Sequence, residues 1–286
     1  MSRPTGNGVA ALAEQREDPF THPMGENVVG KIGIHATEVG DPCGSGMHLH
    51  LTPAVLEDDG HVELGVLGVF LDMACSQAGL NSPFLHADIS THRIDKPRGT
   101  KLLVDAKVAR RGGRSAVVEI DVHDELGERV AYSCQQLRLA PAAQEHDLET
   151  MLAFREKFFA MFDGVCRLPG RLHDTLGLSV ETGPSGETVW RLPLGPTSRN
   201  GFGGLHGGVA FSLVGDAAAG AAAAQLGTAK TTSAHIRYLA PGLAGPFRAE
   251  PRVMPQADGG AFVCVEVFDE GADDALIILG EVHVVS

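Results

Sequence analysis

The sequence repeats itself at an offset of 144 residues, and this repeat limits which folds the chain can adopt. Asp72 and Asp216 are separated by that distance, and so are Pro97 and Pro241. Residues 116–125 resemble residues further on, 261–270, at an offset of 145, with five of ten positions identical. Matches that stay in register over most of each half are typical of a duplicated domain. The 286 residues suit two domains, each large enough to bury a core.

Each half shows the same order of expected elements, namely two short strands, one helix and four longer strands. Alternation of apolar and acidic residues, as in Val118–Asp121, indicates a sheet with one buried and one wetter face. The order predicts an α+β domain in each half, with an antiparallel sheet packed on a helix. The expected strands are 32–39, 47–51, 87–94, 101–110, 115–124 and 129–139, then 176–181, 188–194, 231–239, 247–254, 261–268 and 275–285, and the expected helices are 64–80 and 208–226.

Four segments follow from this organisation. Residues 1–25 are polar and rich in Gly and Pro, lack the features of a signal peptide, and are expected to be a disordered lead-in. Residues 26–140 form the first predicted domain, and residues 171–286 form the second. Residues 141–170 link them, with apolar positions at roughly helical spacing over 145–162.

Charge and composition exclude several classes of function. A net charge of −13 argues against nucleic acid or an anionic membrane as partner. No apolar run reads as a transmembrane helix, because the stretch 215–224 is alanine and glycine around an acid. Five cysteines form no C-x-x-C pair, and their odd number does not suit a disulfide framework. We therefore expect reduced thiols and a cytoplasmic protein.

Histidines suggest metal binding at two places, and neither is convincing. His48 and His50 alternate along one strand, but no third ligand stands at a suitable spacing. The cluster of His86, Asp88 and His92 is discounted in the same way. No metal and no cofactor are predicted.

The most informative stretch runs from Asn200 through Gly-Phe-Gly-Gly-Leu to His206, Gly207 and Gly208, ahead of an alanine-rich helix that contains Asp216. Glycines let the backbone approach a ligand closely. Free N–H groups at a helix start, aided by the helix dipole, suit a polarised carbonyl or an oxyanion. With a carboxylate in the same segment, the pattern indicates attack on an acyl carbonyl. The simpler interpretation, a loop that serves only as a turn, stays open.

The order strand, N-x5-H-G-G, helix with an acid and four strands resembles the hotdog-fold acyl-CoA thioesterases of the phenylacetate-pathway and 4-hydroxybenzoyl-CoA thioesterase type. The strand His235-Ile-Arg-Tyr-Leu-Ala-Pro241 adds to the resemblance. It implies a tandem hotdog, each sheet wrapped around a central helix. It also implies hydrolysis of an acyl-CoA or acyl carrier protein thioester without a cofactor, and a homo-oligomer such as a dimer of double hotdogs.

In that family the motif and the carboxylate come from opposite partners. Asp216 stands ten residues after His206 where the family has nine, and the first half lacks the motif but keeps Asp72. We therefore predict one competent site per chain, which combines Asn200, His206 and Gly207 with Asp72 as the leading acid and Asp216 as the runner-up. The Gly207 N–H would polarise the carbonyl.

Contacts with substrate are expected from residues near this motif, namely Gly208, Thr231, Thr232, Ser90 and Thr91. Thr231 or Thr232 would position a nucleophile by analogy with a family Ser/Thr. Two other functions stay open: an acyl-CoA binding or sensor protein without hydrolysis, and a hydratase or dehydratase of acyl thioesters. The characteristic Asp/His motif of the second class is not found.

Overall fold

The computed structural model describes residues 26–36, 46–78, 84–139, 162–183, 188–201, 203–257 and 259–286. The predicted lead-in and nearly all of the predicted linking helix lie outside these residues. The described chain has the α+β architecture that the repeat predicts. The expected fold class is therefore confirmed.

Apart from two short 3-10 helices, the two halves contain equivalent elements in the same order. The first half comprises α2 (Val28–Lys31), β1 (Ile34–Ala36), β2 (Met47–His50), η2 (Pro53–Val55), α3 (Leu64–Gln77), β3 (Phe84–Arg93), β4 (Lys101–Arg111), β5 (Ser115–Asp124) and β6 (Arg129–Leu139). The second comprises α5 (Leu172–Leu176), β7 (Ser179–Thr182), β8 (Thr188–Leu192), α6 (Val209–Leu226), β9 (Lys230–Tyr238), β10 (Phe247–Pro255), β11 (Ala261–Asp269), η4 (Glu270–Ala272) and β12 (Ala275–Val285). One expectation is wrong: residue 176 ends helix α5, and the strand begins only at Ser179, because Gly177 adopts φ 70° and terminates the helix.

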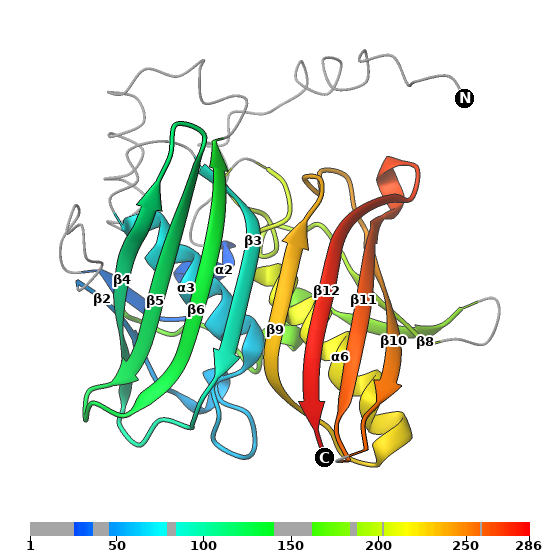
Figure 1. Ribbon diagram of the computed structural model, residues 1–286, viewed down its shortest axis with the longest axis horizontal. Helices are drawn as coiled ribbons and strands as arrows, with labels where there is room; N and C mark the ends of the chain where they lie inside the picture. The colour runs from blue at the N-terminus through cyan, green and yellow to red at the C-terminus, as the bar shows by residue number, and fades with distance from the viewer. Residues whose placement is uncertain are drawn as a thin grey trace.

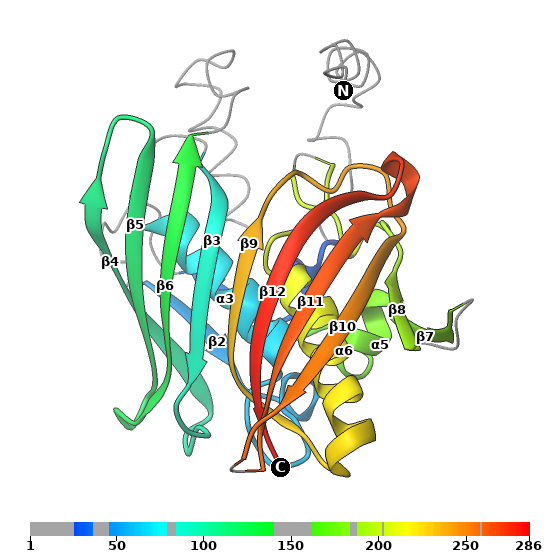
Figure 2. The same ribbon diagram turned by 45° about the vertical axis from the view of Figure 1, so that its right-hand side comes forward.

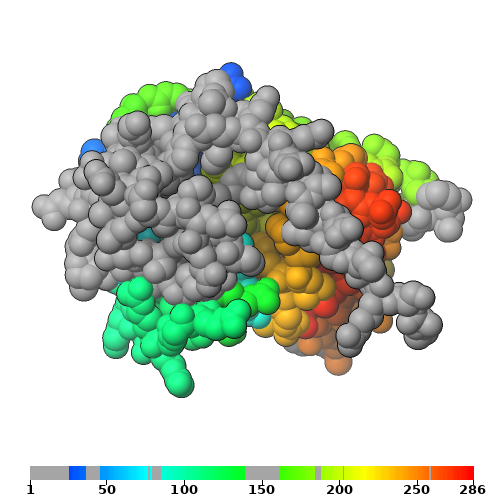
Figure 3. All heavy atoms as spheres, turned by 90° about the horizontal axis from the view of Figure 1, so that it is seen from above, coloured from blue at the N-terminus to red at the C-terminus, as the bar shows by residue number. Residues whose placement is uncertain are grey.

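The strands in the described part of the chain form one sheet of 12 strands, in the order β1-β2-β4-β5-β6-β3-β9-β12-β11-β10-β8-β7. The halves join where β3 pairs antiparallel with β9, with Ser90 opposite His235. Figures 1 and 2 show this continuous sheet, with the blue-to-green strands of the first half on one side and the yellow-to-red strands on the other. Seen from above in Figure 3, the coloured atoms of the two halves lie side by side.

Helices α3 and α6 lie next to each other on the same side of the sheet (Figures 1 and 2). Both are apolar on most sides, which suits helices enclosed between a sheet and a neighbouring helix. By length and composition alone α6 could span a membrane, with a mean hydropathy of 1.4, but 56% of that window is buried inside the fold. It is the core helix of the second half.

Small residues allow the two helices to approach backbone to backbone. A Cβ added to Gly208 would lie 2.4 Å from Val69 Cα, and one added to Gly68 would lie 2.7 Å from Phe211 Cβ. A Cβ on Gly65 would overlap the Ser212 hydroxyl. These distances are shorter than van der Waals contact, so any side chain there would push the helices apart.

One acidic residue in each half has the same structural role. Asp124 accepts hydrogen bonds from the N–H groups of Arg98 and Gly99, at 2.8 and 2.9 Å, after the turn that Pro97 begins. At the duplicated position Asp269 accepts from Leu243, Ala244 and Gly245. Both carboxylates are fully buried. The repeat therefore preserves a carboxylate that closes a loop at one end of each half.

The Asp124 carboxylate also accepts N–H groups from residues that follow it, Leu126 and Glu128. Burial on its own would raise the pKa of Asp124, but the backbone donors outweigh it and hold the pKa below its ordinary value.

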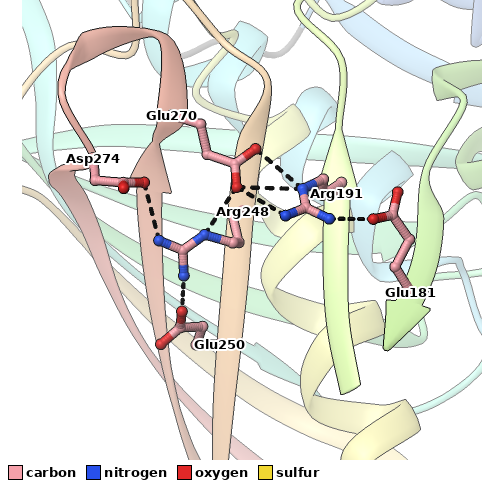
Figure 4. Close-up of polar contacts among 6 residues, drawn as sticks. All are labelled: Glu181, Arg191, Arg248, Glu250, Glu270 and Asp274. Carbon is pink, nitrogen blue, oxygen red and sulfur yellow. Dashed lines mark hydrogen bonds and ion pairs between the residues drawn. The ribbon is translucent and has the colours of Figure 1, made fainter. Parts of the chain in front are cut away.

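A network of ion pairs ties the outer strands of the second half together (Figure 4). Glu270 accepts from Arg191 of β8 and from Arg248 of β10, each at 3.0 Å. Arg191 also pairs with Glu181, and Arg248 pairs with Glu250 and Asp274. The two guanidinium groups therefore connect β7, β8, β10 and the turn that leads into β12.

Replacing Asp124 with Ala should lower the free energy of unfolding by about 2 to 4 kcal/mol, because several buried N–H groups lose a charged acceptor. Urea denaturation measures the change. Stability from this group is present above the ordinary aspartate pKa and is lost as pH falls through the depressed folded pKa. Asp105→Ala on β4, where the side chain is 65% exposed, is the control and should change stability by less than about 0.5 kcal/mol.

Gly208→Ala should destabilise the protein by about 2 to 3 kcal/mol, since the new methyl group meets backbone that cannot move aside. Gly113→Ala is the matched control, because no atom lies within 4 Å of a Cβ added there. Equal thermal midpoints for the two variants would contradict the close packing of α3 on α6.

Candidate active site

The candidate site forms where α3 of the first half meets the start of α6 of the second. Asp72, on α3, accepts a hydrogen bond through Oδ2 from the Gly208 N–H at 2.8 Å. This N–H precedes Val209, the first residue of α6, so the carboxylate lies at the N-terminus of an 18-residue helix. The helix dipole favours a negative charge there. Residues 136 positions apart therefore make one buried contact.

Gly207 leaves the space that Asp72 occupies. A Cβ at this position would lie 2.8 Å from Asp72 Oδ2, so a side chain would displace the carboxylate. Among the described residues no acceptor is found for the Gly207 N–H. An unpaired N–H beside a carboxylate can bind the oxygen of a polarised carbonyl.

His206 hydrogen-bonds to the start of α6. It is only 3% exposed, and its Nδ1 accepts a hydrogen bond from the Gly208 N–H at 3.1 Å. Burial lowers the pKa of His206, with Asp72 acting in the opposite direction and His86 adding to the lowering. The imidazole is therefore neutral at physiological pH.

Two further residues hold the motif loop. The Asn200 amide donates to Leu205 O at 3.1 Å and accepts from Gly204 N at 3.1 Å, which closes the turn before His206. Tyr238 of β9 donates its hydroxyl to Gly207 O at 2.7 Å. Burial, and then the charges of Asp72 and Asp88, raise the pKa of Tyr238 well above its ordinary value, so the phenol keeps its proton.

His86 also lies at this site, although the sequence pattern suggested it only as part of a metal cluster that was discounted, and no such cluster is found in the described part of the chain. Its Nδ1 lies 3.7 Å from Asp72 Oδ1, and its side chain is 11% exposed. The register of β3 on β6 shifts between His86 and Asp88, which marks a β-bulge at Ala87. The extra residue reverses the alternation, so His86 faces the helices whereas Asp88 pairs with His235 of β9. Simple alternation would have placed both on one face.

Asp216 lies about 12 Å further along α6 than Gly208, given the rise of a helix. Burial raises the pKa of Asp216 to about 8, and the nearby carboxylates of Glu63 and Glu57 add to this rise. Its Oδ2 is buried and has no partner among the described residues. At neutral pH this group carries a proton and is a poor base.

In the first half, the positions that correspond to the motif loop of the candidate site make other contacts. Glu63 stands 144 positions before Gly207, and its carboxylate accepts from the N–H groups of Leu172 and His173 at the start of α5, at 3.2 and 3.3 Å. The bulge of β9 falls at Thr232, so the buried Thr231 stands where β3 has His86. The duplicated positions therefore hold a structural contact.

Two of the four Ser/Thr candidates lie in the core and two on the sheet surface. Thr91 and Thr231 are buried, and Thr91 donates to Ser133 at 3.2 Å. Ser90 and Thr232 contact His92 and His283, their neighbours on the sheet surface. The expectation that Ser90 and Thr232 contact substrate is therefore not supported by their contacts.

Gln135 of β6 is a buried polar residue that the sequence analysis missed. Its Nε2 donates to Leu71 O at 3.3 Å, beside Asp72, and its Oε1 has no partner among the described residues. Gln135 alternates with Ala131, Ser133 and Leu137, which are also buried, and this alternation was the available sequence signal.

No group of three or more His, Cys, Asp or Glu side chains that could hold a metal ion is found in the described part of the chain. His48 and His50 place their Nε2 atoms 3.3 Å apart on the surface. The described cysteines, namely Cys75, Cys134, Cys166 and Cys264, are free thiols.

Comparisons with known proteins agree with this architecture. The thioesterase superfamily matches residues 202–275, which span the motif loop, α6 and most of the strands that follow. No curated protein matches the sequence.

Solved structures resemble most of the chain at low sequence identity. A tesB protein of Mycobacterium avium subsp. paratuberculosis aligns with a TM-score of 0.58 at 10% identity, covering 84% of this chain and 91% of that one. A hot dog fold protein of Alicyclobacillus acidocaldarius has a TM-score of 0.58 at 10% identity and covers 84% and 92%. A 12:0-ACP thioesterase of Umbellularia californica has a TM-score of 0.57 at 9% identity and covers 83% and 92%. The chain is thus a tandem hotdog whose second half matches the thioesterase superfamily.

Proposed function

We propose that this protein hydrolyses acyl thioesters to a free acid and a thiol. One observation carries the proposal: Asp72 Oδ2 accepts the Gly208 N–H at 2.8 Å, next to a Gly207 N–H that is unpaired among the described residues. The contact unites a carboxylate and an oxyanion donor from opposite halves. The superfamily match of residues 202–275 supports the same chemistry.

In this mechanism the substrate carbonyl oxygen accepts the Gly207 N–H, which stabilises the negative charge that develops on it. Asp72 provides the charge that drives attack on the carbonyl carbon, either directly or by activating water. Asn200 and Tyr238 keep the loop in the geometry that aims this N–H. No cofactor takes part.

One site per chain is active. Asp216 is protonated at neutral pH, and Glu63 occupies the position that corresponds to Gly207. A glutamate there cannot leave the space that an incoming carbonyl needs, and its carboxylate is bound to the start of α5.

The thiol carrier is CoA or acyl carrier protein. Acyl carrier protein is the carrier named for the Umbellularia californica thioesterase. We place the protein in the cytoplasm, as a homo-oligomer such as a dimer, without a nucleic-acid or membrane partner. Thiol release from aromatic, short, medium and long acyl-CoAs, each at a range of concentrations, tests the activity. Saturable binding without thiol release would instead identify an acyl-CoA binding protein.

Asp72→Asn should lower kcat by about 100-fold or more, because an amide carries no charge to drive the attack. Asp216→Asn is the matched control on the other helix and should retain kcat within about threefold. Both are measured on the best substrate of the acyl-CoA panel. If Asp216→Asn lowered kcat more than Asp72→Asn, Asp216 would be the catalytic carboxylate.

The buried proton of Asp216 should make stability fall with pH. The unfolded chain releases this proton near pH 4, whereas the folded chain keeps it to about pH 8. The free energy of unfolding of the wild type should therefore decline across this window, and Asp216→Asn should remove about 2 to 4 kcal/mol of the decline. Urea denaturation of both proteins at pH 5 and pH 8 measures it. Parallel pH dependences would show that Asp216 ionises normally in the fold.

A further inference from the structure

We propose that His86 is the general base of this hydrolysis, held by Asp72 through Nδ1 and acting on water through Nε2. This role rests on the proposed function and specifies which group activates the water. It follows from the hydrogen bonds of the Gly208 N–H, the position of His86 beside Asp72 and the unpartnered Nε2 of His86 among the described residues.

One carboxylate oxygen of Asp72 accepts a hydrogen bond, and the other lies near His86. Asp72 Oδ2 accepts the Gly208 N–H at 2.8 Å, and Oδ1 lies 3.7 Å from His86 Nδ1. The carboxylate is 6% exposed and therefore has little access to bulk water. Catalytic hydrogen bonds are often long in the absence of substrate, and a small movement closes this one.

His206 cannot be the proton-bearing partner of Asp72, although its Nδ1 lies 3.5 Å from Oδ2. That Nδ1 accepts the Gly208 N–H, so in the neutral ring the proton is on Nε2. The 3.5 Å contact therefore joins two acceptors. Since burial keeps His206 neutral, the donor that Oδ1 can receive is the Nδ1–H of His86.

The other ring nitrogen of His86 is buried and lacks a partner among the described residues. With the proton on Nδ1, facing Asp72, Nε2 presents a free lone pair. A buried acceptor without a partner costs free energy unless water or a ligand occupies it. This nitrogen is therefore available to bind and deprotonate a water molecule.

His86 borders the backbone that would polarise the substrate. A Cβ placed on Gly207 would lie 2.8 Å from Asp72 Oδ2, 3.5 Å from His86 Nδ1 and 3.7 Å from the Tyr238 hydroxyl. The carboxylate, the imidazole and the peptide with the unpaired N–H thus surround one point.

The remaining titratable groups around the site are unsuitable bases. Tyr238 and Cys75 both have their pKa raised well above the ordinary value, chiefly by burial and then by Asp72. Asp88 faces the other side of the sheet and pairs with His235. In the second half Thr231 occupies the position of His86, so within the described residues the dyad exists at one place.

The step balances without a further reactant. Water attacks the carbonyl carbon while Nε2 of His86 takes one of its protons, and the charge moves to the oxygen held by Gly207. As the tetrahedral intermediate collapses, the carbon–sulfur bond breaks and the imidazolium returns the proton to the thiolate. The products are the carboxylic acid and the thiol, and His86 is neutral again.

His86→Gln and its matched control His92→Gln test the role. Both histidines are on β3, but His92 is exposed and contacts Ser90. We expect His86→Gln to lower kcat by about 100-fold with KM nearly unchanged, because the water then lacks a base. His92→Gln should behave as the wild type. A His86→Gln enzyme that keeps kcat within threefold overturns the assignment.

A readout independent of turnover examines the dyad itself. Nitrogen NMR of histidine-labelled protein reports which ring nitrogen carries the proton, and His86→Gln identifies the signal by its loss. The neutral ring should carry its proton on Nδ1 in the wild type and lose that preference in Asp72→Asn. A proton on Nε2 in the wild type contradicts the dyad.

The outcomes separate the two proposals. If the wild type cleaves no thioester in the panel, the proposed function fails and this role fails with it. If the wild type cleaves and Asp72→Asn is inactive while His86→Gln is active, the function stands and only the dyad is wrong.

Discussion

The close approach of α3 to the start of α6 is the contact on which the rest of the structure depends. Gly208 lies against the backbone of Val69, and Gly68 lies against Phe211. With the backbones this close, the carboxylate of Asp72 reaches the first free N–H groups of the neighbouring helix. A site of this kind needs both halves, because neither one contains the motif loop and a suitably placed acid.

Duplication produced two copies with different roles. Both kept the buried aspartates that close a loop, Asp124 and Asp269, since those contacts stabilise each half by itself. The site residues diverged: Glu63 stands where the other half has Gly207 and binds the start of α5 instead, and Thr231 stands where the first half has His86. Loss of one site leaves the fold intact, because the sheet and helix packing do not depend on it.

Much of the fold could be predicted from the sequence. Most strands begin and end within a few residues of the expected positions, because alternation and turn residues are local signals. The helix α5 was missed because five residues give too weak a periodicity. The site was harder: the repeat and the motif placed Asp72 with His206 and Gly207, but His86 was considered only as part of a metal cluster.

The sequence by itself determined the duplication, the order of the elements and the glycine motif, because these are recorded in spacing and composition along the chain. Only the tertiary structure decided the orientation of His86, which depends on a β-bulge at Ala87 that alternation does not reveal. The tertiary structure alone also distinguishes the roles of Asp72 and Asp216. Asp72 meets a helix N-terminus whereas Asp216 is enclosed near other carboxylates, and burial and neighbouring charge are properties of the packed chain.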